Sequence, residues 1–136
     1  MEVRNVMSSP AVVANPSMPI REAALLMRAH GVGALAVLAG DDLVGVVTDR
    51  DIVTRAMPDG AVDRPVGEVM SPDPVTCRAD QPVVVASEVM GEMQIRRLPV
   101  VNGDRRIVGM ISLGDIAENV SEELAGQALG EITEMR

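Results

Sequence analysis

Apolar residues along this chain are spaced as in alternating short strands and helices, and the same order of elements occurs twice. In each half, a short apolar strand precedes a helix with one apolar stripe, and two further strands joined by a turn precede a short helix. Strands are predicted at 12–14, 34–38 and 43–48, and again at 75–77, 98–101 and 107–112. Short helices are predicted at 49–56 and 113–119. The unit is therefore β-α-β-β-α with its first two strands parallel, and the predicted fold class is α/β (α+β).

The two halves form an internal sequence repeat. Residues 3–41 align with residues 66–104 at a spacing of 63. After one inserted residue the spacing becomes 64, and Asp51-Ile52 aligns with Asp115-Ile116. Such a period indicates one supersecondary unit used twice. Because each half of roughly 60 residues would be marginal alone, we expect the halves to pack on one another and the functional site to lie in the cleft between them.

The helix ends carry recognisable signals. Ser17 and Asp80 are the expected N-caps, with Pro19 and Pro82 in the first helical turn, where the missing N–H of proline costs nothing. The last segment, 121–135, is amphipathic and is predicted to form a final helix that packs on the module or on a partner.

Composition narrows the range of functions. The 136 residues include no Phe, Tyr or Trp, so ten Met fill the gaps of an aliphatic core and no aromatic platform exists for stacking bases. The net charge of −8 argues against broad binding to nucleic acid or to anionic membranes. No apolar run approaches the roughly 20 residues that span a bilayer, and the N-terminus has no signal-peptide pattern. The single cysteine, Cys77, excludes an internal disulfide, and the expected location is the cytoplasm.

Several short motifs recur in order in both repeats. Val-Met-Ser precedes each first strand, and a Thr/Ser-x-x-Asp-Ile pattern follows each last strand. The most specific segments are Val44-Gly45-Val46-Val47-Thr48-Asp49-Arg50-Asp51-Ile52, Arg97-Leu98-Pro99-Val100-Val101 and Val108-Gly109-Met110-Ile111-Ser112. Together with the β-α-β-β-α order, these segments resemble the CBS domain pair, or Bateman module, from about residue 3 to residue 119.

The resemblance implies two CBS motifs, at 3–60 and 66–120, packed with pseudo-twofold symmetry, and a C-terminal tail at 121–136. It further implies a standalone, non-catalytic regulatory module that forms a disc-like homodimer and acts on a partner protein. Its ligand would be AMP, ADP, ATP or S-adenosylmethionine, bound in the clefts between the repeats, with no required cofactor. Two alternatives stay open: a ligand-free dimeric interaction or stress-response protein, and an enzyme that depends on a cofactor without a visible motif.

The best candidate site residues are Thr48 and Asp51 in the first repeat and Ser112 and Asp115 in the second. Each pair lies where a strand ends and a helix begins, so free N–H groups and the helix dipole favour a phosphate there. The hydroxyl can donate to a phosphate oxygen, whereas the carboxylate would repel phosphate and instead accept from the two hydroxyls of a ribose. The alternative is structural, because Ser/Thr-x-x-Asp is also a capping box.

Two further groups of residues are candidates through the family resemblance. Arg96 and Arg97 would face the ligand, where an arginine can clamp a phosphate bidentately; the same positions in the first repeat are Gly33 and Ala34. The Ser112–Asp115–Arg97 cleft is therefore the better candidate for a charged nucleotide, unless the two arginines are only solvated surface charges.

Methionines preceding the first strand of each repeat form the second group. Met7 and Met70 would line an adenine pocket according to the resemblance, and as core residues they fit equally well. One histidine, His30, and one cysteine cannot form a multi-ligand metal cluster, and no catalytic constellation is visible. His30 is more simply a favourable charge at the end of its helix, before Gly31.

Overall fold

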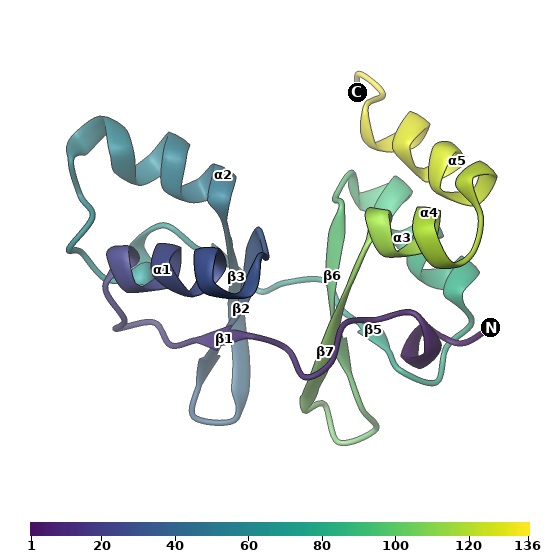
Figure 1. The fold of residues 1–136 in the computed structure, drawn as a ribbon, viewed down its shortest axis with the longest axis horizontal. Coiled ribbons are helices and arrows are strands. Elements are labelled where there is room, and N and C mark those ends of the chain that lie inside the picture. Colours follow the sequence, from purple (N-terminus) through teal and green to yellow (C-terminus); the bar gives the residue numbers. More distant parts are fainter. The chain divides into compact units, whose positions relative to one another are not determined.

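The computed structural model describes residues 1–136, which divide into two compact units. The first-repeat unit consists of Ala11–Pro74, and the second-repeat unit combines Met1–Pro10 with Val75–Arg136. The compact units are thus offset from the sequence repeats: residues 1–10 belong with the second repeat, and residues 66–74 belong with the first. Figure 1 shows the helices and strands of both units.

The first-repeat unit contains a four-stranded sheet in the order β1-β2-β3-β4. Strand β1 pairs with β2 in parallel, and the other two pairings are antiparallel. The strands are β1 (Val13–Ala14), β2 (Ala34–Ala39), β3 (Asp42–Thr48) and β4 (Ser71–Pro72). The helices are α1 (Ile20–His30), the short α2 (Asp49–Asp51) with its π-helical continuation Ile52–Ala56, and the 3₁₀ turns Met57–Asp59 and Val66–Glu68.

The second-repeat unit repeats this plan with a three-stranded sheet in the order β5-β6-β7. Strand β5 is again parallel to β6, and β6 is antiparallel to β7. The elements are the 3₁₀ turn Val3–Asn5, β5 (Cys77–Arg78), α3 (Val83–Met93), β6 (Arg97–Val101), β7 (Ile107–Ser112), α4 (Leu113–Asn119) and α5 (Glu122–Ile132). The predicted fold class and the parallel first pairing are therefore confirmed, and α5 is the predicted final helix. No helix is both long and apolar enough to cross a membrane.

Each unit has its own hydrophobic core, built from the apolar stripe of its long helix and the central strand of its sheet. In the first-repeat unit the stripe Ile20, Ala23 and Met27 is buried, as predicted, against Leu35 and Val37 of β2. The second-repeat unit has the matching set Val83, Ala86, Met90, Leu98 and Val100. Burying these side chains on one face of each sheet supplies the main stabilisation of each unit.

The expected N-caps are wrong. Pro19 and Pro82 themselves occupy the N-cap positions, and neither helix start has a side-chain cap. The Ser17 N–H and hydroxyl instead donate to Asn15 Oδ1, and Asp80 accepts from Arg78. The first-turn N–H groups of α1 and α3 find backbone carbonyls of remote segments: Ile20 donates to Arg64, Arg21 to Val62, and Val83 to Met1. Tertiary partners thus satisfy donors that a local cap usually takes.

Each sheet is extended by the segment that precedes the other repeat in the sequence. The N-terminal segment runs beside β7, where Ser8 and Met110 exchange two backbone hydrogen bonds of 2.8 and 3.0 Å (Figure 1). In the other unit, β4 lies beside β3 with Ser71 opposite Val46.

A glycine at the matching position of β3 and β7 permits this close approach. A Cβ at Gly109 would lie 2.6 Å from the Ser8 carbonyl oxygen and 2.8 Å from Met7 Sδ. A Cβ at Gly45 would lie 2.9 Å from the Ser71 carbonyl oxygen and 2.5 Å from Met70 Sδ. The repeat therefore carries glycine where a strand from outside the repeat must pack on it.

Helix α5 covers a face of α3, and the equivalent face of α1 in the other unit is exposed. It packs on α3 and α4, and its start is capped by the Ser121 hydroxyl, which accepts from the Leu124 N–H. Under it, Ser87 and Gly91 of α3 are buried, whereas the equivalent residues of α1, Ala24 and Arg28, are exposed. The two units therefore present different surfaces although they share a fold.

Replacement of Gly109 by alanine tests the packing of the N-terminal segment on β7. The added methyl group must displace the Ser8 backbone, so Gly109→Ala is expected to lower the free energy of unfolding by about 1–3 kcal/mol in urea titrations. Gly126→Ala is the matched control, because a Cβ at this α5 position meets nothing within 4 Å. It is expected to raise stability by about 0.5–1 kcal/mol. Unchanged stability in Gly109→Ala would contradict the close approach.

Candidate functional site

The Thr/Ser-x-x-Asp motifs form complete capping boxes at both strand–helix junctions. Thr48 Oγ1 accepts from the Asp51 N–H at 3.1 Å, while Asp51 Oδ2 accepts from the Thr48 N–H at 2.9 Å. Ser112 and Asp115 repeat the arrangement at 3.1 and 2.9 Å. The structural alternative considered from the sequence is thus present in both repeats. Each box fixes a hydroxyl and a carboxylate side by side at the end of a sheet.

The capping boxes leave part of each side chain unused. Both hydroxyl groups accept a hydrogen bond, and neither donates one, so the protons of Thr48 and Ser112 remain available. Asp115 uses only Oδ2; its Oδ1 has no hydrogen bond or ion pair, and it is open to solvent because no buried side-chain oxygen lacks a partner. Asp51 differs, since its Oδ1 lies 3.8 Å from Nη1 of Arg55. Capping and ligand contact are therefore compatible at Ser112 and Asp115.

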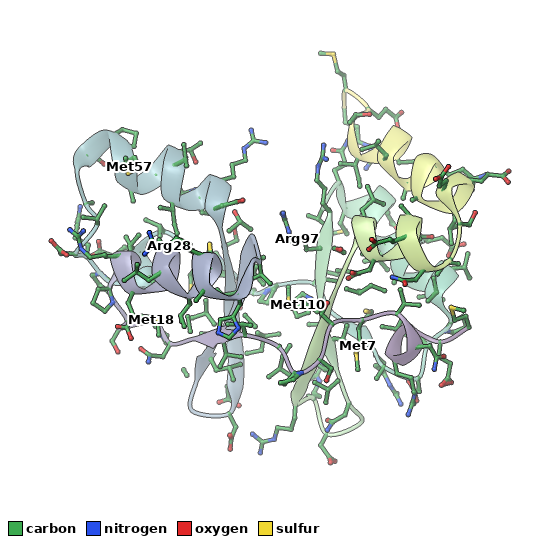
Figure 2. All side chains as sticks on the ribbon, viewed as in Figure 1. Met7, Met18, Arg28, Met57, Arg97 and Met110 are labelled. Carbon is green, nitrogen blue, oxygen red and sulfur yellow. The ribbon has the colours of Figure 1, made fainter.

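Residues at the start of β6 and β2 lie directly opposite the two hydroxyls. Arg97 pairs with Ser112 across β6 and β7, and Ala34 pairs with Thr48 across β2 and β3. Opposed residues of antiparallel strands point to the same face, with Cβ atoms about 5 Å apart. Arg97 therefore lies on the same face as Ser112, and its guanidinium has no ion pair. Figure 2 labels the Arg97 side chain at the start of β6. In the first-repeat unit the same place holds only a methyl group.

Arg96 has a different position from its neighbour. Its carbonyl accepts from the Leu113 N–H at 2.9 Å, just as the Gly33 carbonyl accepts from Asp49. Arg96 lies in the bend that precedes β6, and this residue is exposed. Of the two predicted arginines, only Arg97 belongs to the strand and lies opposite Ser112 in its register.

The two methionines are partly buried core residues that lie beside the glycines of β3 and β7. Met70 packs on the core of the first-repeat unit, and Met7 packs on that of the second. Met7 also lines a pocket of about 280 Å³ at the hairpin end of the sheet, opposite the end that carries Arg97 and Ser112. The pocket is lined by Arg4, Met7, Ala79, Asp80, Asn102, Gly103 and Val108. No other predicted site residue belongs to it.

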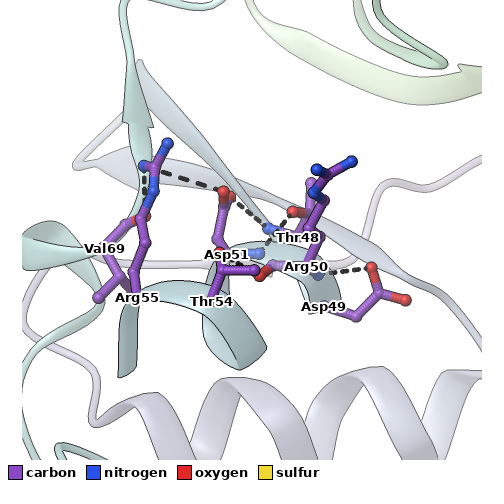
Figure 3. A network of polar contacts seen from close by, with 7 residues as sticks. All are labelled: Thr48, Asp49, Arg50, Asp51, Thr54, Arg55 and Val69. Atoms are coloured by element: carbon purple, nitrogen blue, oxygen red, sulfur yellow. Dashed lines mark hydrogen bonds and ion pairs between the residues drawn. The ribbon is translucent and has the colours of Figure 1, made fainter. Parts of the chain in front are cut away.

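One further residue at the first-repeat junction, Arg55, was not among the predicted site residues. Arg55 lies one helical turn after Asp51, and its Nη1 also donates to the Val69 carbonyl at 3.1 Å (Figure 3). A signal was available: the spacing of 64 places Asn119 at the equivalent position, so the repeats differ here as well. The structure shows that this difference touches a candidate site carboxylate.

The remaining reactive side chains are separate from one another. His30 is the last residue of α1, before Gly31 in the left-handed conformation, as its sequence position suggested. Burial raises the pKa of the Cys77 thiol to about 11, so this side chain is a protonated core residue at neutral pH. No three His, Cys, Asp or Glu side chains gather in a way that could hold a metal ion.

Comparison with known proteins identifies the family. The CBS domain model matches residues 3–57 and again residues 66–122. The chain belongs to the CBS domain family. It is 41% identical over 133 residues to the CBS domain-containing protein YhcV of Bacillus subtilis (strain 168), which covers 96% of this chain and 94% of YhcV.

Two solved CBS proteins of similar fold contain adenosyl ligands. The CBS domain pair of protein MJ0100, in complex with 5′-methylthioadenosine and S-adenosyl-L-methionine, has a TM-score of 0.79 and 28% identity, covering 87% of this chain and 94% of that one. CBSX2 in complex with AMP has a TM-score of 0.74 and 27% identity, covering 86% of this chain and 93% of that one. The resemblance inferred from the sequence motifs is thereby confirmed.

Proposed function

We propose that this CBS protein is a non-catalytic regulatory module that binds an adenosine nucleotide on the second-repeat unit. The observation that carries the proposal is a pair of charged groups without a partner in the protein at one end of one sheet: Asp115 Oδ1 and the Arg97 guanidinium. They do not pair with each other, and each matches a different part of a nucleotide. Adenosyl ligands in CBS proteins of the same fold support this assignment.

Each side chain has a defined role in the proposed complex. Asp115 Oδ1 accepts from the ribose hydroxyls while Oδ2 keeps its cap on the Ser112 N–H. The Ser112 proton and the Arg97 guanidinium donate to phosphate oxygens, and the charge-assisted bonds of Arg97 are the stronger of the two. Because Arg97 is cationic and otherwise unpaired, a nucleoside phosphate such as AMP, ADP or ATP is favoured over S-adenosylmethionine, whose sulfonium is positive.

Binding would act through differential affinity. A ligand shifts a protein between two states only by the difference in its affinity for them. The proposed ligand replaces solvent at Asp115 and Arg97, so it favours the state in which both groups converge on it. This is the sense in which the module is regulatory, and no cofactor or chemical step is required.

We also propose that two copies associate in the cytoplasm, as the family resemblance and the single cysteine suggest. The exposed apolar side chains Leu25, Val53 and Met57 on the helical segments of the first-repeat unit support self-association. On the second-repeat unit, α5 already covers the corresponding helix.

Thermal unfolding with millimolar AMP, ADP, ATP and S-adenosylmethionine tests the function. A ligand that binds only the folded chain, at a hundred times its Kd, stabilises it by about 2.7 kcal/mol and raises Tm. We expect the largest shift with a nucleoside phosphate. Asp115→Ala should abolish that shift, measured against its own ligand-free Tm, whereas the matched variant Asp51→Ala should retain it. The absence of a shift with all four compounds would contradict the proposal.

Affinities for AMP and adenosine separate the phosphate contact from the ribose contact. Loss of a charge-assisted hydrogen bond costs about 1.5–3 kcal/mol, so Arg97→Ala should weaken AMP binding by at least about tenfold in calorimetric titrations. Adenosine, which lacks the phosphate, should bind this variant as it binds the wild type. Arg96→Ala removes the same charge from the adjacent position and should have a much smaller effect. Equal losses in the two variants would indicate long-range attraction rather than a contact.

A further inference from the structure

Arg55 contacts both the Asp51 carboxylate and the Val69 backbone at the first-repeat junction. Its Nη1 lies 3.8 Å from Asp51 Oδ1 and donates to the Val69 carbonyl at 3.1 Å, as the dashed lines in Figure 3 show. Asp51 Oδ2 is already taken by the Thr48 N–H. Both oxygens of the Asp51 carboxylate are therefore engaged within the chain, and Asp51 is itself a buried residue.

The second repeat has no such contact. The residue equivalent to Arg55 is Asn119, whose Nδ2 donates to the Asp115 main-chain carbonyl at 2.9 Å rather than to the carboxylate. Asp115 Oδ1 thus keeps no partner. The two capping boxes have the same hydrogen-bond distances, 2.9 and 3.1 Å, so the contact of residue 55 or 119 is what distinguishes the two carboxylates.

The Val69 carbonyl gives the Arg55 side chain a fixed place. An isolated ion pair of a half-exposed arginine contributes little, because solvent screens it and the side chain is free to leave. Here the guanidinium is also anchored to a buried backbone residue, Val69, next to Met70, which packs over Gly45. The same hydrogen bond therefore orients the cation toward the carboxylate.

We infer that Arg55 closes the Thr48–Asp51 position to a ribose, so that one chain binds one nucleoside phosphate, on the second-repeat unit. This inference rests on the proposed function. A ribose hydroxyl that donates to Asp51 Oδ1 competes for that oxygen with the guanidinium 3.8 Å away, whereas at Asp115 it displaces only solvent. Arg55 is thus a specificity-determining residue that acts by occupying its own repeat's site, and Ala34 offers no cation for a phosphate there.

Exchange of the two residues tests the inference by titration calorimetry with AMP. The wild type should bind one AMP per chain, and Arg55→Asn, which gives the first repeat the residue of the second, should bind two. The second site should be the weaker, by about tenfold or more, because Ala34 stands where Arg97 stands. The double variant Arg55→Asn/Asp115→Ala should keep one site. Arg28→Asn removes the same charge from an exposed, unpaired position of the same unit and should leave the stoichiometry at one.

The reciprocal variant Asn119→Arg keeps the test decisive if Arg55→Asn fails to fold. An arginine at position 119 should reach Asp115 and weaken AMP binding by at least about tenfold. Two sites in the wild type, or one site in a folded Arg55→Asn with unimpaired binding in Asn119→Arg, would overturn the inference while leaving nucleotide binding intact. No AMP binding by the wild type or by any variant would instead overturn the proposed function, and the inference with it.

Discussion

The candidate site depends on one hydrogen bond at the strand–helix junction of each repeat, from the last N–H of the strand to an aspartate. The backbone N–H at the end of β3 and of β7 has left the sheet and needs an acceptor, since an unpaired donor near the core costs about 1–3 kcal/mol. In both repeats an aspartate three residues later supplies one carboxylate oxygen. This hydrogen bond fixes the carboxylate at the end of the sheet through Oδ2, and the cap makes no use of Oδ1.

The two repeats differ in what lies next to Oδ1 of the aspartate. In the first, Arg55 neutralises it; in the second, it faces solvent on the same unit as the unpaired Arg97. Duplication of a sequence thus produced two equal capping boxes and unequal sites. The difference arises at two positions of the repeat alignment, 34 against 97 and 55 against 119, and neither alters the fold.

Features that depend on residues close together in the sequence were predictable, and contacts between residues far apart in the sequence were not. The β-α-β-β-α order, the apolar stripe of α1 and the capping boxes all follow from spacing within a few residues. The failed caps at Ser17 and Asp80 and the packing of residues 1–10 on the second repeat depend on backbone groups more than 40 residues away, such as Arg64 for Ile20. Gly45 and Gly109 were a sequence signal for the packing of another segment on β3 and β7, because a repeated glycine inside a strand indicates close backbone approach.

The candidate site shows the same division. The hydroxyl–carboxylate pairs form the capping boxes that the sequence pattern allowed, and Arg97 lies opposite Ser112, while their contact with a ligand stays a prediction. The place of Arg97 opposite Ser112, and the pocket of Met7 at the far end of the sheet, required the strand register to be known. Arg55 was missed because an ordinary exposed arginine in a helix gives no signal until its acceptors are seen.

A crystal structure of the chain grown with AMP tests the central claim most directly. The account predicts one nucleotide per chain, with a ribose hydroxyl within hydrogen-bonding distance, about 2.5–3.0 Å, of Asp115 Oδ1. Arg97 should lie on the phosphate, and Arg55 should remain on Asp51. A nucleotide bound at Asp51, or one bound elsewhere while Asp115 Oδ1 still faces solvent, would contradict it.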